Sequence, residues 1–158
     1  MTNKFKIFLS LAVLYALFIF YLSSQSNPGD PISFLEKIDS RELRNLIKSI
    51  DNSNFQFILY PLYLYSMYPD KVLHAILYAG FGLLLYPVLK NSPYPTMSKY
   101  ALLFAIIIGT IYGASDEFHQ SFVPGRTASV NDLYADCIGV TIAQTIIFIK
   151  DKLYYIKL

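Results

Sequence analysis

Polar side chains that could carry chemistry gather in one stretch of this sequence, GASDEFHQSFVPGRTASVNDLYAD, residues 113–136. The stretch supplies carboxylates, an imidazole, an amide and a guanidinium, on Asp116, Glu117, His119, Gln120, Arg126, Asp132 and Asp136. Lys71 and His74 stand at the start of an earlier apolar run and complete the candidate set. Carboxylates and imidazoles can act as acid and base or bind Mg²⁺, Mn²⁺ or Zn²⁺. Lysine and arginine can instead bind a phosphate or carboxylate group of a ligand.

The composition around these residues is that of a membrane protein. The 158 residues are 54% hydrophobic and only 15% charged, with a mean hydropathy of +0.41, whereas soluble domains average roughly 25% charged residues. A chain of this length forms one domain, residues 1–158. The net charge of +2 and the lack of a basic run exclude a nucleic-acid partner. The single cysteine, Cys137, excludes an internal disulfide framework and a cysteine-rich zinc site.

Four long apolar runs predict four transmembrane helices, at residues 5–22, 71–90, 99–117 and 132–150. Each is close to the roughly 20 residues that a helix needs to cross a bilayer core. Isolated strands would leave backbone groups unpaired in lipid, so the runs must be helical and the fold class is all-α. The first run has features of a signal peptide, but its length and the lack of an A-x-A site favour an uncleaved span.

The short lysine-bearing flanks of the spans indicate how the chain is oriented. Lys4 and Lys6 precede the first span, Lys90 and Lys99 lie between the second and third, and Lys150 ends the fourth. Basic residues in short flanks favour the cytoplasmic side. We therefore predict a multi-pass protein of the cell membrane with both termini in the cytoplasm.

The long loop at residues 23–70 is predicted to be extracytoplasmic and partly helical. Within residues 32–50 the apolar side chains fall mostly on one helical face. This pattern is typical of a helix on the membrane surface or against the bundle, and it also fits a small soluble lid. Residues 55–69 are rich in tyrosine and are interrupted by Pro61, which favours a short interfacial or re-entrant segment.

The alternation of the spans places the candidate residues at one end of the bundle. The second span starts, the third ends and the fourth starts on the outer side. Asp116 and Gln120 are four residues apart and share a helical face, as do Asp132 and Asp136. Each polar stripe continues inward into small or aromatic residues, and small residues let helices approach closely in lipid. The sequence predicts an outward-facing polar pocket that is closed below by glycine-mediated packing.

Purely structural roles also explain several of these residues. Asp70 follows Pro69 at the start of a helix and fits an N-cap. Ser129 and Asp132 have the S-x-x-D spacing of a capping box. Asp136 lies one turn deeper and cannot cap, which favours a functional or ion-pair role.

The remaining candidates have two interpretations each. His74 could be a hydrogen-bonded buried histidine, and His119 could lie in water on the loop. Pro124 and Gly125 predict a turn that aims Arg126. Arg126 could form a salt bridge to a nearby acid, or present a planar fork to an anionic ligand.

Three segments together resemble a known family. SSQS follows the first span, DKVLHAILYAGFGLLL lies in the second, and GASDEFHQSFVPGRTASVNDLYADCIG crosses the third and fourth. They resemble the VanZ-like family of bacterial membrane proteins, over all four spans in order. The family is named after a protein associated with teicoplanin resistance, so the resemblance implies a cell-envelope role connected with glycopeptide resistance, without a specified mechanism. Family members often carry asparagine where this chain has Asp136, so the chain departs from the pattern there.

Three functions follow from these observations. In the first, the pocket binds a phosphate- or carboxylate-bearing envelope molecule, such as a lipid-linked one, through Arg126 and Lys71, with membrane lipids as the surrounding partners. In the second, a histidine and the carboxylates form an enzyme site, with or without a metal, although no H-E-x-x-H spacing or known nucleophile motif is present. In the third, the polar cluster holds a structural or partner-binding module together. The sequence names no cofactor and does not decide whether a reaction is catalysed.

Overall fold

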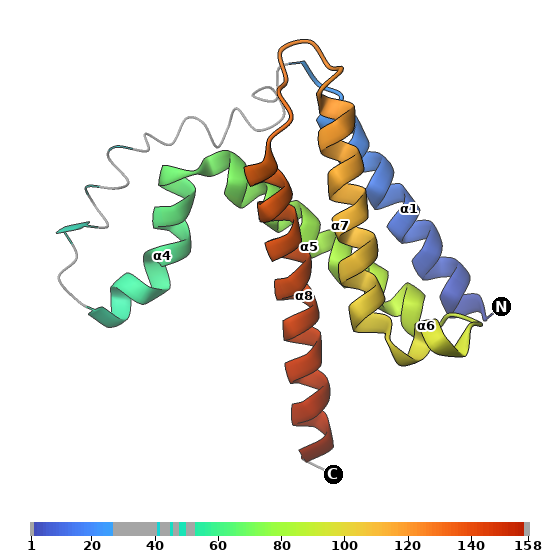
Figure 1. The fold of residues 1–158 in the computed structure, drawn as a ribbon. Coiled ribbons are helices and arrows are strands. Elements are labelled where there is room, and N and C mark those ends of the chain that lie inside the picture. Colours follow the sequence, from blue (N-terminus) through green and yellow to red (C-terminus); the bar gives the residue numbers. More distant parts are fainter. Residues whose placement is uncertain (1, 27–40, 42–44, 46–47, 50–52, 157–158) are drawn as a thin grey trace.

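The computed structural model describes residues 2–26, 41, 45, 48–49 and 53–156 (Figure 1). Over these residues the protein is helical and contains no strand. The helices are α1 (Asn3–Ser23), α4 (Ser53–Met67), α5 (Pro69–Lys90), α6 (Pro95–Lys99), α7 (Ala101–Gln120) and α8 (Val130–Ile156). The predicted all-α fold is therefore confirmed for the part of the chain that is described.

Four of these helices are long and apolar enough to cross a membrane: α1, α5, α7 and the Val130–Leu153 portion of α8. They correspond to the four predicted spans, and the chain is a multi-pass membrane protein. The clearest difference between the predicted spans and the helices is at their polar ends. The third span was predicted to end at residue 117 and the fourth to begin at 132, whereas α7 continues to Gln120 and α8 begins at Val130. The polar residues there belong to the helices rather than to the loop.

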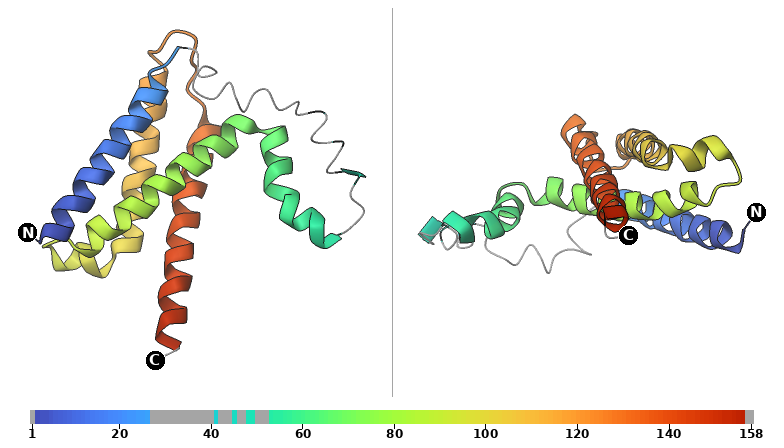
Figure 2. Two further views of the ribbon diagram at one scale, coloured as in Figure 1. Left: turned by 180° about the vertical axis from the view of Figure 1, so that it is seen from behind. Right: turned by 90° about the horizontal axis from the view of Figure 1, so that it is seen from below.

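The four long helices alternate in direction, as Figures 1 and 2 show. α1 and α7 run toward the loop that joins α7 to α8, and α5 and α8 run away from it. Both termini lie at the opposite end of the molecule from this loop. Their shared end agrees with the predicted topology, while the side of the membrane on which they lie stays a prediction.

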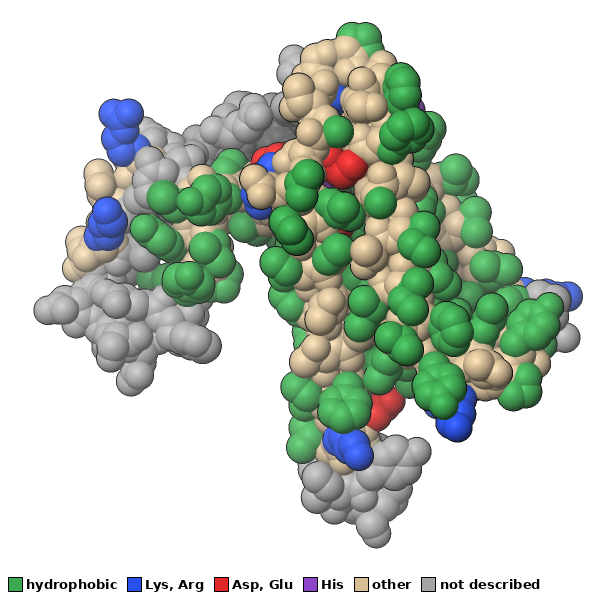
Figure 3. Space-filling view, in the orientation of Figure 1, with side chains coloured by type: hydrophobic (Ala, Val, Ile, Leu, Met, Phe, Trp, Pro, Cys, Tyr) green, Lys and Arg blue, Asp and Glu red, His purple; other side chains and the backbone are tan. Residues whose placement is uncertain are grey.

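α5 is the central helix of the bundle and packs against α1, α7 and α8. Its residues Tyr78, Phe81 and Leu85 form the buried core together with Ile19 of α1 and Val140 of α8. Large apolar side chains on the other faces are exposed, and Figure 3 shows them covering the outer surfaces of the helices. Such a surface suits contact with lipid rather than water.

Glycines bring the central helices close together. A Cβ added at Gly109 of α7 would lie 2.7 Å from Cγ2 of Val140, and one added at Gly82 of α5 would lie 3.1 Å from the Cβ of Ala143. Beside Gly82, the side-chain amide of Gln144 donates a 2.9 Å hydrogen bond to the Gly82 carbonyl. Because lipid supplies no hydrophobic force between helices, this close packing and interhelical hydrogen bonding hold the bundle together. The predicted glycine-mediated packing below the polar residues is confirmed.

α4 occupies the tyrosine-rich segment and stands to one side of the bundle (Figures 1 and 2). Its 15 residues continue as helix through Pro61, and they are fewer than the roughly 20 needed to span a bilayer. Among the described elements α4 contacts only α5. Its predicted interfacial or re-entrant position stays a prediction. The helix predicted at residues 32–50 lies largely outside the described residues.

Candidate functional site

The first turns of α5, the last turns of α7 and the first turns of α8 meet at one end of the bundle, which we call the polar end. All four candidate carboxylates are buried, as is Gln120. The four are Asp116, Glu117, Asp132 and Asp136. Figure 3 shows acidic side chains, with basic ones beside them, gathered in the upper part of the molecule near the start of α8. The predicted convergence of three distant segments is observed in the structure.

His74 of α5 and Asp136 of α8 form a polar contact between two helices of the polar end. The Nδ1 atom of His74 lies 2.9 Å from Oδ1 of Asp136, and Asp136 is 0% exposed. On the α7 side, a Cβ at Gly113 would lie 2.9 Å from Oδ2 of Asp136. Glycine at this position therefore leaves room for the carboxylate. Asp136 thus lies between α5, α7 and α8, and its contact with His74 fits the functional or ion-pair role that its depth along the fourth span favoured.

Lys71 forms ion pairs with both Asp132 and Asp70. Its Nζ lies 3.0 Å from Oδ2 of Asp70 and also contacts Oδ1 of Asp132. The predicted N-cap role of Asp70 is wrong, because Tyr68 is the N-cap and Pro69 takes the first helical position. Asp70 lies in the first turn of α5 instead, where the positive end of the helix dipole stabilises its negative charge.

The capping box at the start of α8 is shared between two helices. The backbone N–H of Asp132 donates to Oγ of Ser129 at 3.3 Å, as the S-x-x-D spacing predicts. The backbone N–H of Ser129, however, donates to Oε2 of Glu117 on α7 at 2.6 Å. Glu117 therefore takes the place that Asp132 would occupy in a local capping box. As a result, the Asp132 carboxylate is available to pair with Lys71.

Several buried oxygen atoms of the polar end have no hydrogen-bond partner within the described part of the chain. Gln120 donates from Nε2 to Oδ2 of Asp116 at 3.1 Å, as their shared face predicts. The other oxygen of Asp116, one oxygen each of Glu117 and Asp136, and the hydroxyl of Tyr78 are left without a partner. An unpartnered buried polar atom costs about 1–3 kcal/mol. Such atoms indicate a place where water, an ion or a ligand binds.

Among the described residues, Arg126 bonds to carbonyls at the end of α1 and not to a carboxylate. Its Nε donates to the carbonyl of Gln25 at 3.1 Å and its Nη2 to the carbonyl of Leu22 at 3.2 Å. The salt bridge considered from the sequence is therefore wrong for this structure. The last carbonyls of a helix have no partner within the helix, so a planar donor fork suits this position. The preceding Gly125 has φ of +82°, and a Cβ there would lie 3.0 Å from the carbonyl oxygen of Ser26.

His119 also contacts α1 and lies apart from the carboxylate cluster. Its Nε2 is 3.0 Å from Oγ of Ser24, and its ring lies 4.4 Å from the ring of Phe20, centroid to centroid. His119 is half-buried rather than simply in water on the loop. Together with Arg126, it joins the SSQS segment after α1 to the loop after α7.

A cavity of about 270 Å³ opens beside these groups. It is lined by Ile19, Leu22, Tyr65, Pro69, Asp70, Leu73, His74, Leu77, Tyr78, Asp116 and Arg126. The contributions of α1 and of Tyr65 on α4 were missed from the sequence. The first span is apolar on all sides, so its pattern does not show which face packs against the bundle. A tyrosine among many others likewise gives no signal of its own.

Among the described residues of the polar end, carboxylates outnumber lysine and arginine side chains. Five carboxylates lie there, four of them buried and one exposed on Asp70, against the cations Lys71 and Arg126. Lys71 serves Asp70 and Asp132, while Arg126 is bonded to backbone carbonyls. Burying several carboxylates together is costly unless a proton or a cation neutralises them. The arrangement therefore favours proton exchange, cation binding, or a ligand rich in hydrogen-bond donors.

Comparison with known proteins places the chain in a family. The family model described as VanZ/LLP1 matches residues 7–151, which include all four long helices except their outermost residues and the whole polar end. Searches of curated proteins and of solved structures found no match. Since the match covers nearly the whole chain, the protein belongs to the VanZ/LLP1 family.

Proposed function

We propose that this protein binds a phosphate- or carboxylate-bearing amphiphile of the cell envelope, such as a lipid-linked molecule, in the cavity at the polar end. The observation that carries the proposal is the mixed lining of that cavity. Apolar side chains from α1 and α5 surround a few convergent polar groups, which is the usual composition of a small-molecule site. A connection of such binding with glycopeptide resistance is the expectation that follows from membership of the VanZ-like family.

The apolar part of the amphiphile would lie along α1 and α5. Ile19 and Leu22 of α1 and Leu73 and Leu77 of α5 line the cavity. The helices are surrounded by lipid, so an acyl or prenyl chain would enter from the membrane without crossing water. With both termini in the cytoplasm, the polar head would lie at the outer surface.

The polar head would be held chiefly by Arg126. Its two carbonyl contacts use two of the five N–H donors of a guanidinium, and the others suit a phosphate or carboxylate group. His74 and Asp116 also line the cavity and would bind hydroxyl groups of the head. Lys71 is engaged with Asp70 and Asp132, so we assign it to positioning rather than to direct anion binding.

The proposal is tested by filling the cavity. Leu22→Trp places a bulky ring in the lining, while Leu14→Trp adds the same ring on the outer face of α1, where Leu14 is 62% exposed. Native mass spectra would be recorded for the wild type and both variants, as purified and after addition of a polyprenyl phosphate or phosphatidylglycerol. We expect bound lipid in the wild type and in Leu14→Trp, and its loss from a folded Leu22→Trp. Equal lipid binding by all three proteins would refute the cavity as the site.

The contact between His74 and Asp136 favours an enzyme as the second candidate. A carboxylate at Nδ1 orients the imidazole, and the residue itself lines the cavity, which is the arrangement of an oriented general base. The reaction class would be hydrolysis of a bond in the bound head group, with His74 accepting a proton from water. Chemical turnover of the added lipid by the wild type and its loss in His74→Gln would support this candidate. Lipid that stays chemically unchanged after long incubation with the wild type would refute this enzyme candidate, and binding would remain the proposed function.

A further inference from the structure

We propose a divalent metal site formed by His74, Glu117 and Asp136, where α5, α7 and α8 meet. One ligand atom from each residue lies within 4.8 Å of the ligand atoms of the other two. Bonds of about 2.1 Å place opposite ligands of a cation about 4.2 Å apart, so a small contraction would complete the site. One imidazole nitrogen with two carboxylate oxygens suits Zn²⁺ or Mn²⁺.

Two unpartnered oxygens provide independent support for a ligand at this point. Glu117 is 6% exposed, and its Oε2 accepts the Ser129 N–H while its Oε1 has no partner among the described residues. Asp136 is 0% exposed, and its Oδ1 contacts His74 while its Oδ2 is likewise without a partner there. Glu117 is thus held in place by one oxygen and retains the other for a ligand, while Asp136 already lies against the imidazole that would share the ion with it. Fixing ligating side chains in this way is characteristic of metal sites.

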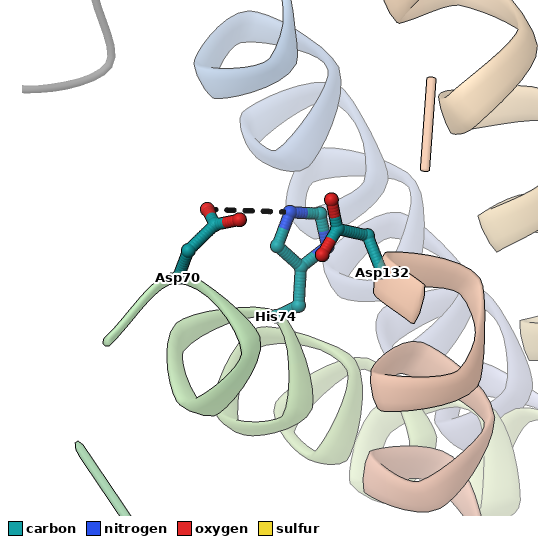
Figure 4. A group of neighbouring side chains, drawn as sticks. All are labelled: Asp70, His74 and Asp132. Atoms are coloured by element: carbon teal, nitrogen blue, oxygen red, sulfur yellow. Dashed lines mark ion pairs between the residues drawn. The ribbon is translucent and has the colours of Figure 1, made fainter. Parts of the chain in front are cut away.

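A second group of possible ligands, Asp70, His74 and Asp132, lies nearer the surface (Figure 4). Figure 4 shows Asp70 and Asp132 on opposite sides of the His74 imidazole. Both acids already contact Lys71, whose ammonium would repel a metal ion. Asp70 is also 56% exposed, so water competes for its oxygens. The deeper group is therefore the better site.

The charge of the deeper group also favours a cation. Glu117 and Asp136 bring two carboxylates to one imidazole, and neither Lys71 nor Arg126 is paired with them. A divalent ion would balance two carboxylates. His74 also lines the cavity, which gives the ion a route to the site. The inference does not depend on the proposed amphiphile, although a bound ion would add to the attraction of an anionic head group.

The test is a metal titration of the full-length protein, purified in mild detergent with a tag that contains no histidine. The protein would be stripped with a chelator and titrated with Zn²⁺ or Mn²⁺, and bound metal would be measured by elemental analysis. We expect about one ion per chain in the wild type. Glu117→Gln and Asp136→Asn, which keep the side-chain size, should weaken binding by about 10–100-fold or more, since loss of even an outer-shell partner has that effect.

Two controls locate the ion. Asp70→Asn alters only the shallower group and should bind metal as the wild type does. Asp151→Asn changes an acid at the opposite end of α8, and it should also bind metal as the wild type does. Far-UV circular dichroism in chelator would verify that each variant is folded, and metal should raise the melting temperature of the wild type but not of Glu117→Gln or Asp136→Asn. No stoichiometric binding by the wild type refutes the site. Loss of binding in Asp70→Asn but not in Asp136→Asn also overturns it, in favour of the shallower group.

Lipid retention measured on the same samples separates this inference from the proposed function. A protein that binds metal but no lipid would refute only the amphiphile cavity. A protein that binds lipid but no metal would refute only the metal site.

Discussion

Gly139→Ala sets helix propensity directly against helix packing. Alanine is favoured over glycine in a helix interior by about 1 kcal/mol, so propensity alone predicts a more stable protein. In the structure, however, a Cβ at Gly139 would overlap the carbonyl oxygen of Ala75 on α5 and would lie 2.9 Å from its carbonyl carbon. The obstacle is backbone, which cannot rotate away as a side chain can, so α5 and α8 would have to separate.

The size of the effect follows from that separation. Ordinary contact begins at 3.4 Å, and the nearest obstacle is the carbonyl oxygen, so the helices would have to move apart by about 1 Å, in a closely packed interior that yields little. His74 and Asp136, on the same two helices, are 2.9 Å apart and would move beyond hydrogen-bond distance. Overpacking costs about 1–3 kcal/mol, and loss of a charge-assisted hydrogen bond costs about 1.5–3 kcal/mol. After the gain in propensity, we expect a net loss of about 2–4 kcal/mol in the free energy of unfolding.

The assay is unfolding by sodium dodecyl sulfate in mild detergent, followed by far-UV circular dichroism. Gly80→Ala is the matched control, because the Cβ there would meet the phenol end of Tyr15, a side chain that can move. It carries the same propensity gain, so its stability should stay within about 1 kcal/mol of the wild type. If Gly139→Ala is as stable as Gly80→Ala, the close packing of α5 on α8 and the positioning of His74 that depends on it are refuted.

Two further predictions concern the ionic and hydrogen-bonded contacts of the polar end. Arg126→Ala removes the guanidinium donors from the carbonyls of Leu22 and Gln25, of which Leu22 keeps the backbone N–H of Gln25. It should lower the free energy of unfolding by about 2–4 kcal/mol, measured in the same detergent titration; Arg126→Lys should recover less than half of the loss, and full recovery would show that charge alone matters. Lys71→Met leaves the carboxylate of Asp132 buried and unpaired, which we expect to cost about 1–3 kcal/mol because Lys71 is itself 33% exposed. Adding Asp132→Asn should restore most of that stability, and a double-mutant cycle without coupling would contradict the ion pair.

The fold could be predicted from the sequence because lipid leaves few alternatives. In lipid, the backbone N–H and C=O groups of a long apolar run can be paired only within a helix formed by that run. Four apolar runs therefore predicted four spanning helices. The spacing of Asp116 and Gln120 also predicted their shared face, and their hydrogen bond confirms it. Likewise, Ser129 and Asp132 carry the local signal of a helix start, and half of that capping box is present in the structure.

The partners of the polar residues could not be predicted in the same way. The sequence offered Arg126 several nearby acids, yet its donors go to carbonyls of α1. Glu117 was expected in the pocket, but it is not among the residues that line the cavity, and it completes the cap of α8 through Ser129 instead. His119 belongs to the same stretch as the buried carboxylates but turns toward Ser24.

The difference between these two sets has a physical reason. Length, hydropathy and the three- and four-residue spacings are properties of a single helix, so the sequence alone determined the spans, the polar end and the faces of its helices. The contacts of Arg126, Glu117 and His119 depend on how one helix is rotated and shifted against another. That arrangement is set by glycine contacts such as those of Gly109 and Gly139, which join helices far apart in the chain, and only the tertiary structure decided it.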